Sequence, residues 1–384
     1  MNGGALGRGP GLGSLAEVSS QSSIVVCCGP GGVGKTTVSA ALAVQGAAEG
    51  RRAIVVTVDP ARRLANALGL DALPDTPHQI AGDWPGELWA LMLNPKSTFD
   101  SLVVKYAPRP EQAETILSNR FYRNIAGALS GTQEYMAMET LYELYVESGY
   151  DLIVVDTPPT RNALDFVDAP RRLTRFLDNR IFRLLMLPTR VGLKAVNAAA
   201  QTFLRTVSRT VGGQVVTDAI AFFQAFEGME DGFRDRAQRV LDLLTDPATA
   251  FVLVASPRRD AVVEAGFFTD KLAEADIPVQ GLVMNRMQPR FATGWASEAD
   301  RERARTLSGT ALGALWANLA DLHALADAEE REVAGLVKRV APGPVARVPL
   351  FGSDVHDLDG LAAVGAWLGG AGATGGAEGP SSAP

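Results

Sequence analysis

The glycine-rich segment over residues 29–37 constrains the fold of this chain more than any other feature. It reads Gly-Pro-Gly-Gly-Val-Gly-Lys-Thr-Thr and satisfies the spacing G-x-x-x-x-G-K-[ST]. An apolar run at 24–28 precedes it and a helical pattern follows, which is the strand-turn-helix context that the motif requires. Its glycines let the backbone turn tightly, so that successive N–H groups and the helix N-terminus point at one anion. The alternative is a glycine-rich turn without a ligand.

The residue types in this loop predict a nucleoside triphosphate and a divalent cation as its ligands. Lys35 would neutralise the β- and γ-phosphates, and the hydroxyl of Thr36 would coordinate Mg²⁺. We therefore predict that ATP and Mg²⁺ bind here. The residues predicted to bind the nucleotide in this loop are Gly31, Gly32, Val33, Gly34, Lys35, Thr36 and Thr37.

Two aspartates each follow an apolar run, as carboxylates at the carboxyl edge of a parallel sheet do. Asp59, in the stretch Val-Asp-Pro-Ala, could orient or deprotonate an attacking water, whereas the alternative is a surface Asp-Pro turn. Asp156 ends a strand-like run as a Walker B aspartate does and would hold Mg²⁺ through water, whereas the alternative is a plain strand-terminating residue. We assign Lys35, Asp59 and Asp156 to catalysis. Thr36, Asp59 and Asp156 form the predicted metal site.

Asn285 follows the apolar run at 282–284 and is a candidate for base recognition. Its amide can act as donor and acceptor at once, which matches an adenine edge and favours ATP over GTP. A simple turn role for Asn285 is the alternative.

Short β-branched runs recur along the chain without polar alternation, which is typical of strands buried on both faces. The predicted strands cover residues 24–28, 53–58, 88–93, 152–155, 251–255, 282–284 and 345–348. Helical patterns separate them, and this order predicts an α/β fold with a doubly wound, mainly parallel sheet. Consecutive helical patterns at about 96–150 and 161–245 predict a helical subdomain inserted into this P-loop domain, which spans 22–368. The Gly- and Ser-rich ends, 1–21 and 369–384, are predicted to be disordered.

Charge and cysteine content exclude several classes of partner. The 36 basic and 43 acidic residues give a net charge of −7 without a basic block, so we expect no nucleic-acid binding. The two cysteines, Cys27 and Cys28, are adjacent in a predicted strand, where they point to opposite faces, which argues against a disulfide.

Neither a charged-then-apolar leader nor a run of about 18 apolar residues occurs, so we expect a cytoplasmic protein without an integral membrane segment.

Together these motifs resemble those of one known family. The loop over 29–37, the stretch Asp-Pro-Ala at 59–61 and the run Asp-Thr-Pro-Pro-Thr at 156–160 are similar to motifs of the arsenite-pump ATPases and their relatives that target tail-anchored proteins. The resemblance covers residues 22–366. It implies an ATP-driven dimer whose helical subdomains open and close with nucleotide state to handle a client.

The resemblance also implies roles for individual residues. An aspartate at the position of Asp59 activates water in this family, and one at the position of Asp156 contacts Mg²⁺ indirectly. The segment Val-Pro-Leu-Phe at 348–351 resembles the family's loop that closes over the adenine, which makes Pro349 a candidate nucleotide-binding residue.

One departure from the family's pattern concerns the loop itself. The family carries a signature lysine directly after the first glycine, which reaches the phosphates of the partner subunit, and here this position is Pro30. A cation supplied in trans can raise the rate of phosphoryl transfer by several orders of magnitude. A homodimer would lack this lysine in both sites, so our hypothesis is a heterodimer with a paralogous subunit that carries it. The alternatives are a homodimer in which another residue substitutes, or slow hydrolysis.

Other departures bear on the client. Arsenite binding requires soft thiolates, and both cysteines lie in a predicted buried strand, so arsenite transport is disfavoured. No C-x-x-C pair exists, so a zinc-bridged dimer is not expected. Apolar residues of the helical insert, such as the run 181–187, could line a groove for a protein client, with ordinary helix packing as the alternative. The competing function is a low-activity nucleotide-binding regulatory subunit that pairs with a catalytic paralogue.

Overall fold

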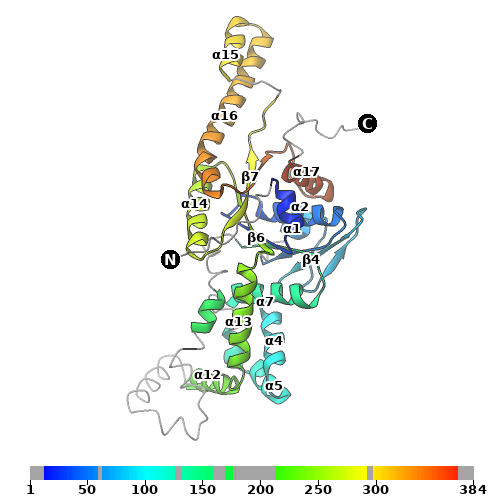
Figure 1. Ribbon diagram of the computed structural model, residues 1–384, viewed down its shortest axis with the longest axis vertical. Coiled ribbons are helices and arrows are strands. Elements are labelled where there is room, and N and C mark those ends of the chain that lie inside the picture. Colours follow the sequence, from blue (N-terminus) through cyan, green and yellow to red (C-terminus); the bar gives the residue numbers. More distant parts are fainter. Residues whose placement is uncertain are drawn as a thin grey trace, which may run out of the picture. The chain divides into compact units, whose positions relative to one another are not determined.

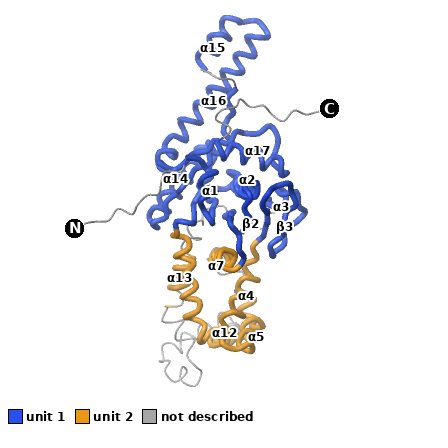
Figure 2. The backbone as a smooth tube through the Cα atoms, turned by 45° about the vertical axis from the view of Figure 1, so that its right-hand side comes forward, with its two compact units in different colours: residues 1–92, 148–164, 247–384 blue, residues 93–147, 165–246 orange. Residues whose placement is uncertain are grey.

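The computed structural model describes residues 13–58, 63–125, 132–158, 169–175, 178, 213–291 and 297–370. It divides the chain into two compact units, which Figure 2 colours separately. Unit 1 comprises residues 1–92, 148–164 and 247–384, and unit 2 comprises residues 93–147 and 165–246. The predicted helical insertions are residues 96–150 and 161–245. Much of the second range, including the run 181–187, lies outside the described residues.

Unit 1 is built on an eight-stranded sheet of order β3-β4-β2-β5-β1-β6-β7-β8. Figure 1 labels β4, β6 and β7 of this sheet. All neighbouring strands pair in parallel except β3 and β4, which are antiparallel. The strands are β1 (Ile24–Cys28), β2 (Arg52–Thr57), β3 (His78–Ile80), β4 (Glu87–Met92), β5 (Leu152–Asp156), β6 (Thr249–Ala255), β7 (Val279–Met287) and β8 (Val345–Pro349). The predicted α/β fold with a mainly parallel sheet is therefore confirmed. Strand β3 was not among the predicted strands, because its three residues are too few to show a pattern of burial.

The central strands β1, β5 and β6 are almost entirely apolar, which is typical of strands buried on both faces of a sheet. Every residue of β1, β5 and β6 is buried. Val25 and Cys27 of β1 belong to a core that also contains residues of α2 (Lys35–Ala48) and α17 (Leu358–Leu368), two helices that pack on each other. Cys28 points to the opposite face by strand alternation and is equally buried.

The N-terminal segment corrects one prediction. Disorder was expected through residue 21, but α1 (Leu15–Gln21) is a helix whose N-cap, Ser14, accepts a hydrogen bond from the N–H of Glu17. Leu15 and Val18 are each 1% exposed, and α1 packs against α2 and β7. Burial of these two apolar side chains offsets the entropy of ordering a Ser-rich segment.

Two further helices of unit 1, α15 (Ser297–Thr306) and α16 (Ala311–Val340), form a hairpin. No separate prediction for them came from the sequence. α15 packs along α16, and the ring Nδ1 of the buried His323 lies 2.7 Å from the Oδ2 of Asp300. α14 (Arg259–Glu274) packs against α16 and β6.

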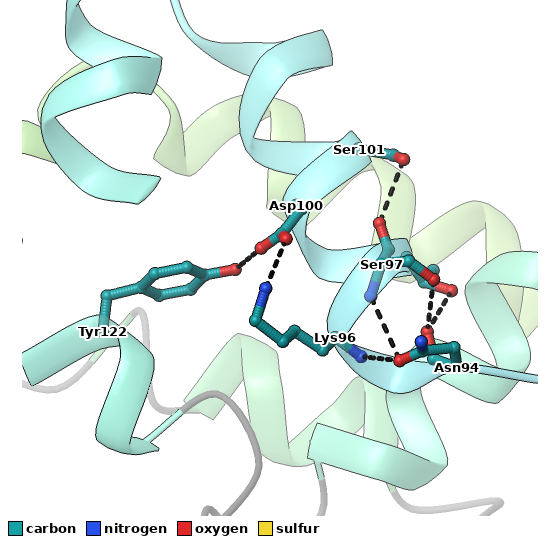
Figure 3. A network of polar contacts seen from close by, with 7 residues as sticks. Asn94, Lys96, Ser97, Asp100, Ser101 and Tyr122 are labelled. Carbon is teal, nitrogen blue, oxygen red and sulfur yellow. Dashed lines mark hydrogen bonds and ion pairs between the residues drawn. The ribbon is translucent and has the colours of Figure 1, made fainter. Parts of the chain in front are cut away.

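In unit 2 every described element is a helix. They include α4 (Pro95–Tyr106), α5 (Pro110–Ser118), α6 (Arg120–Ile125), α7 (Thr132–Glu147), α12 (Gly213–Ala225) and α13 (Glu230–Thr245). Aromatic rings fill much of the core, with Phe99 stacked on Tyr122 at 5.5 Å between centroids. Figure 3 shows the polar start of α4, where the side chain of Asn94 accepts from the N–H groups of Lys96 and Ser97 and where Asp100 binds Lys96 and the Tyr122 hydroxyl.

None of the helices in the described part of the chain combines the length and the apolar character that crossing a membrane requires.

Candidate nucleotide-binding site

The loop between β1 and α2 has the shape of an anion cradle. Gly29 has φ +143°, and a Cβ at this position would lie 2.0 Å from the carbonyl oxygen of Val254 on β6, so only glycine fits. Gly34, the N-cap of α2, has φ +91°, and no side chain among the described residues caps the helix there. The first turn of α2 follows this loop directly, and the dipole at a helix N-terminus favours a negatively charged ligand.

Lys35 lies inside this loop rather than in solvent. Its side chain is 6% exposed, and Nζ donates to the carbonyl oxygens of Gly29 at 3.0 Å and of Pro30 at 2.8 Å. Gly31 and Gly32 at the tip of the loop are exposed, and Thr37 is half-buried on the first turn of α2. The ammonium group is thus held beside the backbone that would surround a phosphate.

Thr36 and Asp156 meet at the base of the loop although 120 residues separate them. The Oγ1 of Thr36 donates to Oδ2 of Asp156 at 2.8 Å. Asp156 is the last residue of β5 and is 1% exposed. A hydroxyl and a carboxylate oxygen at this spacing are hard oxygen donors of the kind that Mg²⁺ prefers.

Thr57 joins this pair, and the sequence analysis did not identify it. The last residue of β2, it lies opposite Asp156 in the parallel register, and its Oγ1 donates to the same Oδ2 at 3.0 Å. Its side chain is 2% exposed. The signal that could have found it is its place two residues before Asp59, because the two strands end at the same edge of the sheet.

Asp59 itself lies in residues 59–62, outside the described part of the chain. Within that part, no three His, Cys, Asp or Glu side chains gather as a metal cluster. Of the three residues of the predicted metal site, the structure describes Thr36 and Asp156, and magnesium sites commonly combine such oxygens with those of substrate phosphates.

Asn285 lies against the loop. Its Nδ2 donates to the carbonyl oxygen of Val33 at 2.8 Å, and its Oδ1 accepts from the N–H of Arg286 at 3.0 Å. A Cβ on Gly34 would lie 2.3 Å from Nδ2, so the glycine permits this approach. The amide of Asn285 therefore contacts the loop. The sequence had indicated only a contact with the adenine base.

Pro349 lies on β8, the strand that pairs with the strand of Asn285. It is the last residue of β8 and pairs with Met287 of β7, two residues after Asn285. The N–H of Leu350 donates to the carbonyl oxygen of Met287 at 2.8 Å, and Leu350 is 54% exposed. The ends of β7 and β8 therefore lie side by side near the loop.

Cys27 and Cys28 differ in protonation state from the cysteines that bind metals and metalloids. Burial raises the pKa of the Cys27 thiol to about 12 and raises the pKa of Cys28 well above its usual range. Both side chains are at most 1% exposed. Each remains a neutral thiol at physiological pH, whereas soft metal and metalloid binding uses the thiolate.

Comparison with known proteins agrees with the geometry. The sequence pattern of the family described as anion-transporting ATPase matches residues 22–301. The chain is 27% identical over 264 residues to a protein named ATPase ARSA2 of Chlamydomonas reinhardtii, covering 67% of this chain and 66% of that protein. It is 29% identical over 166 residues to ATPase GET3 of Malassezia globosa, covering 43% and 48%, and 26% identical over 314 residues to ATPase GET3C of Arabidopsis thaliana, covering 75% of each.

The match therefore spans between about half and three quarters of the length of these curated relatives. The family pattern, however, covers most of this chain and includes the loop, Asp156 and Asn285. The chain belongs to the anion-transporting ATPase family.

Proposed function

We propose that this protein binds ATP together with Mg²⁺ and hydrolyses the terminal phosphate. The observation that carries the proposal is the 2.8 Å contact between Thr36, on the first turn after the loop, and the buried Asp156 at the end of β5. In the proposed site these two groups are the hydroxyl of a Walker A threonine and the carboxylate of a Walker B aspartate. Membership of an ATPase family supports the same reading.

Phosphate binding would use the backbone and Lys35. The N-terminus of α2 would present backbone N–H groups to the phosphates, and the ammonium group, which now contacts the carbonyl oxygens of Gly29 and Pro30, would contact phosphate oxygens. Thr36 and Asp156 would hold Mg²⁺, Asp156 through water. The ion would contribute charge neutralisation at the phosphates.

Hydrolysis needs a group that positions the attacking water, and we propose Asp59. It comes two residues after Thr57, the last residue of β2, whose hydroxyl donates to the carboxylate of Asp156. An aspartate at this edge can orient water toward a phosphate held in the loop. Asn285 and Pro349 are proposed to border the adenine, since both lie on the adjoining strands β7 and β8.

Pro30 favours a second candidate function. This side chain is buried in the loop and carries no charge where the family has its signature lysine, so the chain lacks a cation to offer a partner from this position. A low-activity regulatory subunit would fit that feature. We propose a dimer, either with a second copy or with a lysine-bearing paralogue, and handling of a client other than arsenite, given the neutral thiols.

The test measures binding of a fluorescent ATP analogue and steady-state ATP hydrolysis for the wild type and for Lys35→Ala, Asp59→Asn and Pro30→Lys. We expect Lys35→Ala to lose nucleotide binding and Asp59→Asn to bind normally without turnover. Full ATP affinity in Lys35→Ala would refute the binding proposal, and normal turnover in Asp59→Asn would remove Asp59 from the mechanism.

The Pro30→Lys variant separates the two candidate functions, with the mass of each sample determined by light scattering. A nearly inactive wild type whose dimeric Pro30→Lys variant gains rate supports pairing with a lysine-bearing subunit. Brisk turnover in the wild type, unchanged in the variant, would exclude the regulatory function and the need for such a partner.

A further inference from the structure

Strand β7 carries a bulge beside the phosphate loop. Its pairing with β8 shifts between Met284 and Met287, so that two residues, Asn285 and Arg286, lie opposite a single residue of β8. In a regular strand, neighbouring side chains point to opposite faces of the sheet. Here both reach the same loop, because Nδ2 of Asn285 donates to the carbonyl oxygen of Val33 and Nη1 of Arg286 donates to that of Gly32 at 3.0 Å.

Arg286 adopts a backbone conformation that is unfavourable for its type. Its φ is +60°, and Asp276 is the other non-glycine residue with positive φ in the described part of the chain. A left-handed conformation is unfavourable for a residue with a Cβ atom, and residues retained in such conformations gather at functional sites. Glycine would satisfy the backbone better, so the side chain of Arg286 is the reason to expect a function.

The contacts of β7 orient two successive peptide groups of the loop. In a trans peptide the C=O and N–H point in opposite directions. Arg286 holds the Gly32 carbonyl toward β7, so the N–H of Val33 points away from that strand. Asn285 does the same for the Val33 carbonyl and hence for the N–H of Gly34. These N–H groups belong to the loop that we propose binds phosphate.

We propose that Arg286 is a positioning residue for the phosphate-binding loop, which rests on the ATP-binding function proposed above. Its guanidinium fixes the peptide between Gly32 and Val33 in the orientation that presents N–H groups to phosphate. It also places a permanent positive charge beside a loop whose second residue, Pro30, has none. The ligand class is a nucleoside di- or triphosphate, since both place phosphate in this loop.

The test is Arg286→Gly, which removes the guanidinium and at the same time relieves the positive φ. We expect ATP and ADP to bind about three- to ten-fold more weakly, as the loss of one exposed, charge-assisted hydrogen bond predicts. The melting temperature should be unchanged or higher. Arg286→Lys, which keeps the charge, should recover part of the affinity, and the loss in Arg286→Gly should shrink as salt is raised from about 0.05 M to about 0.5 M.

Asp276→Gly is the matched control. Asp276 has φ +61° in the connection between α14 and β7 and is exposed, so its replacement relieves the same strain and should leave nucleotide affinity unchanged. Wild-type ATP affinity in Arg286→Gly would overturn the proposal, as would an equal loss of affinity in Asp276→Gly. An equal weakening of adenosine binding would also overturn it, because adenosine carries no phosphate.

The Lys35→Ala variant measured in parallel keeps this inference distinct from the proposed function. If Lys35→Ala loses ATP and Arg286→Gly does not, the positioning role is wrong and the ATP site stands. If Lys35→Ala keeps full ATP affinity, the proposed site itself is wrong, and the role of Arg286 falls with it.

Discussion

Replacing Thr57 with valine tests whether the hydroxyl of Thr57 orients the carboxylate of Asp156 for Mg²⁺ binding. Valine fills nearly the same space but lacks the hydroxyl that donates to Oδ2 of Asp156 at 3.0 Å. Because Asp156 is 1% exposed, bulk water replaces the lost donor poorly. The variant therefore changes the polar environment of the carboxylate while the apolar packing of β2 is largely kept.

The expected magnitude follows from these contacts. A hydrogen bond to a charged group contributes about 1.5–3 kcal/mol, so the free energy of unfolding should fall by about that amount. Groups that orient a metal-binding residue are worth about 10- to 100-fold in metal affinity. Thr36 continues to donate to the same oxygen at 2.8 Å, so we expect the lower end, about a ten-fold rise in the Mg²⁺ concentration that supports half-maximal ATP binding.

The assay combines urea denaturation with a Mg²⁺ titration of fluorescent ATP binding. Thr57→Ser keeps the hydroxyl and should behave like the wild type in the titration. Thr269→Val is the matched control, since Thr269 is a buried threonine of α14 whose hydroxyl donates to the carbonyl oxygen of Ala265. If Thr57→Val and Thr269→Val both keep the wild-type Mg²⁺ midpoint, Thr57 does not orient Asp156 and the reasoning is refuted.

Two further predictions concern buried groups. Arg236→Met should lower the free energy of unfolding by about 3–5 kcal/mol, because the fully buried Glu139 accepts from the Nε of Arg236 at 2.6 Å. Urea denaturation should show much of this loss recovered in the double variant Glu139→Leu/Arg236→Met, and no recovery would contradict the ion-pair explanation. The raised pKa values of Cys27 and Cys28 predict that neither thiol reacts with a chromogenic disulfide reagent before unfolding, so rapid reaction in the native state would contradict their burial.

Much of unit 1 was predictable because its signals are local. Unalternated β-branched runs indicated the strands of a sheet buried on both faces, and each predicted strand overlaps an observed one. The spacing of glycines, Lys35 and Thr36 indicated the loop, and the run ending in Asp156 indicated its acidic neighbour. Strand-helix order predicted that these residues would meet at one edge, as Thr36 and Asp156 do.

Other features depended on packing between distant segments. The helix over Leu15–Gln21 lies in a stretch whose Gly- and Ser-rich composition predicts disorder, and its order comes from burial of Leu15 and Val18 against α2 and β7. Composition reports the average tendency of a segment to bury apolar surface, whereas two well-placed side chains can decide the outcome when a surface is ready to receive them.

The sequence by itself determined that the chain forms a mainly parallel α/β sheet with a glycine-rich loop and a carboxylate at its edge, because period and motif spacing are properties of neighbouring residues. Only the tertiary structure decided which groups complete that edge. Thr57 lies 99 residues from Asp156, and Arg286 lies 254 residues from Gly32. Such contacts depend on strand order, register and a single bulge in β7, and no local pattern of residues specifies these.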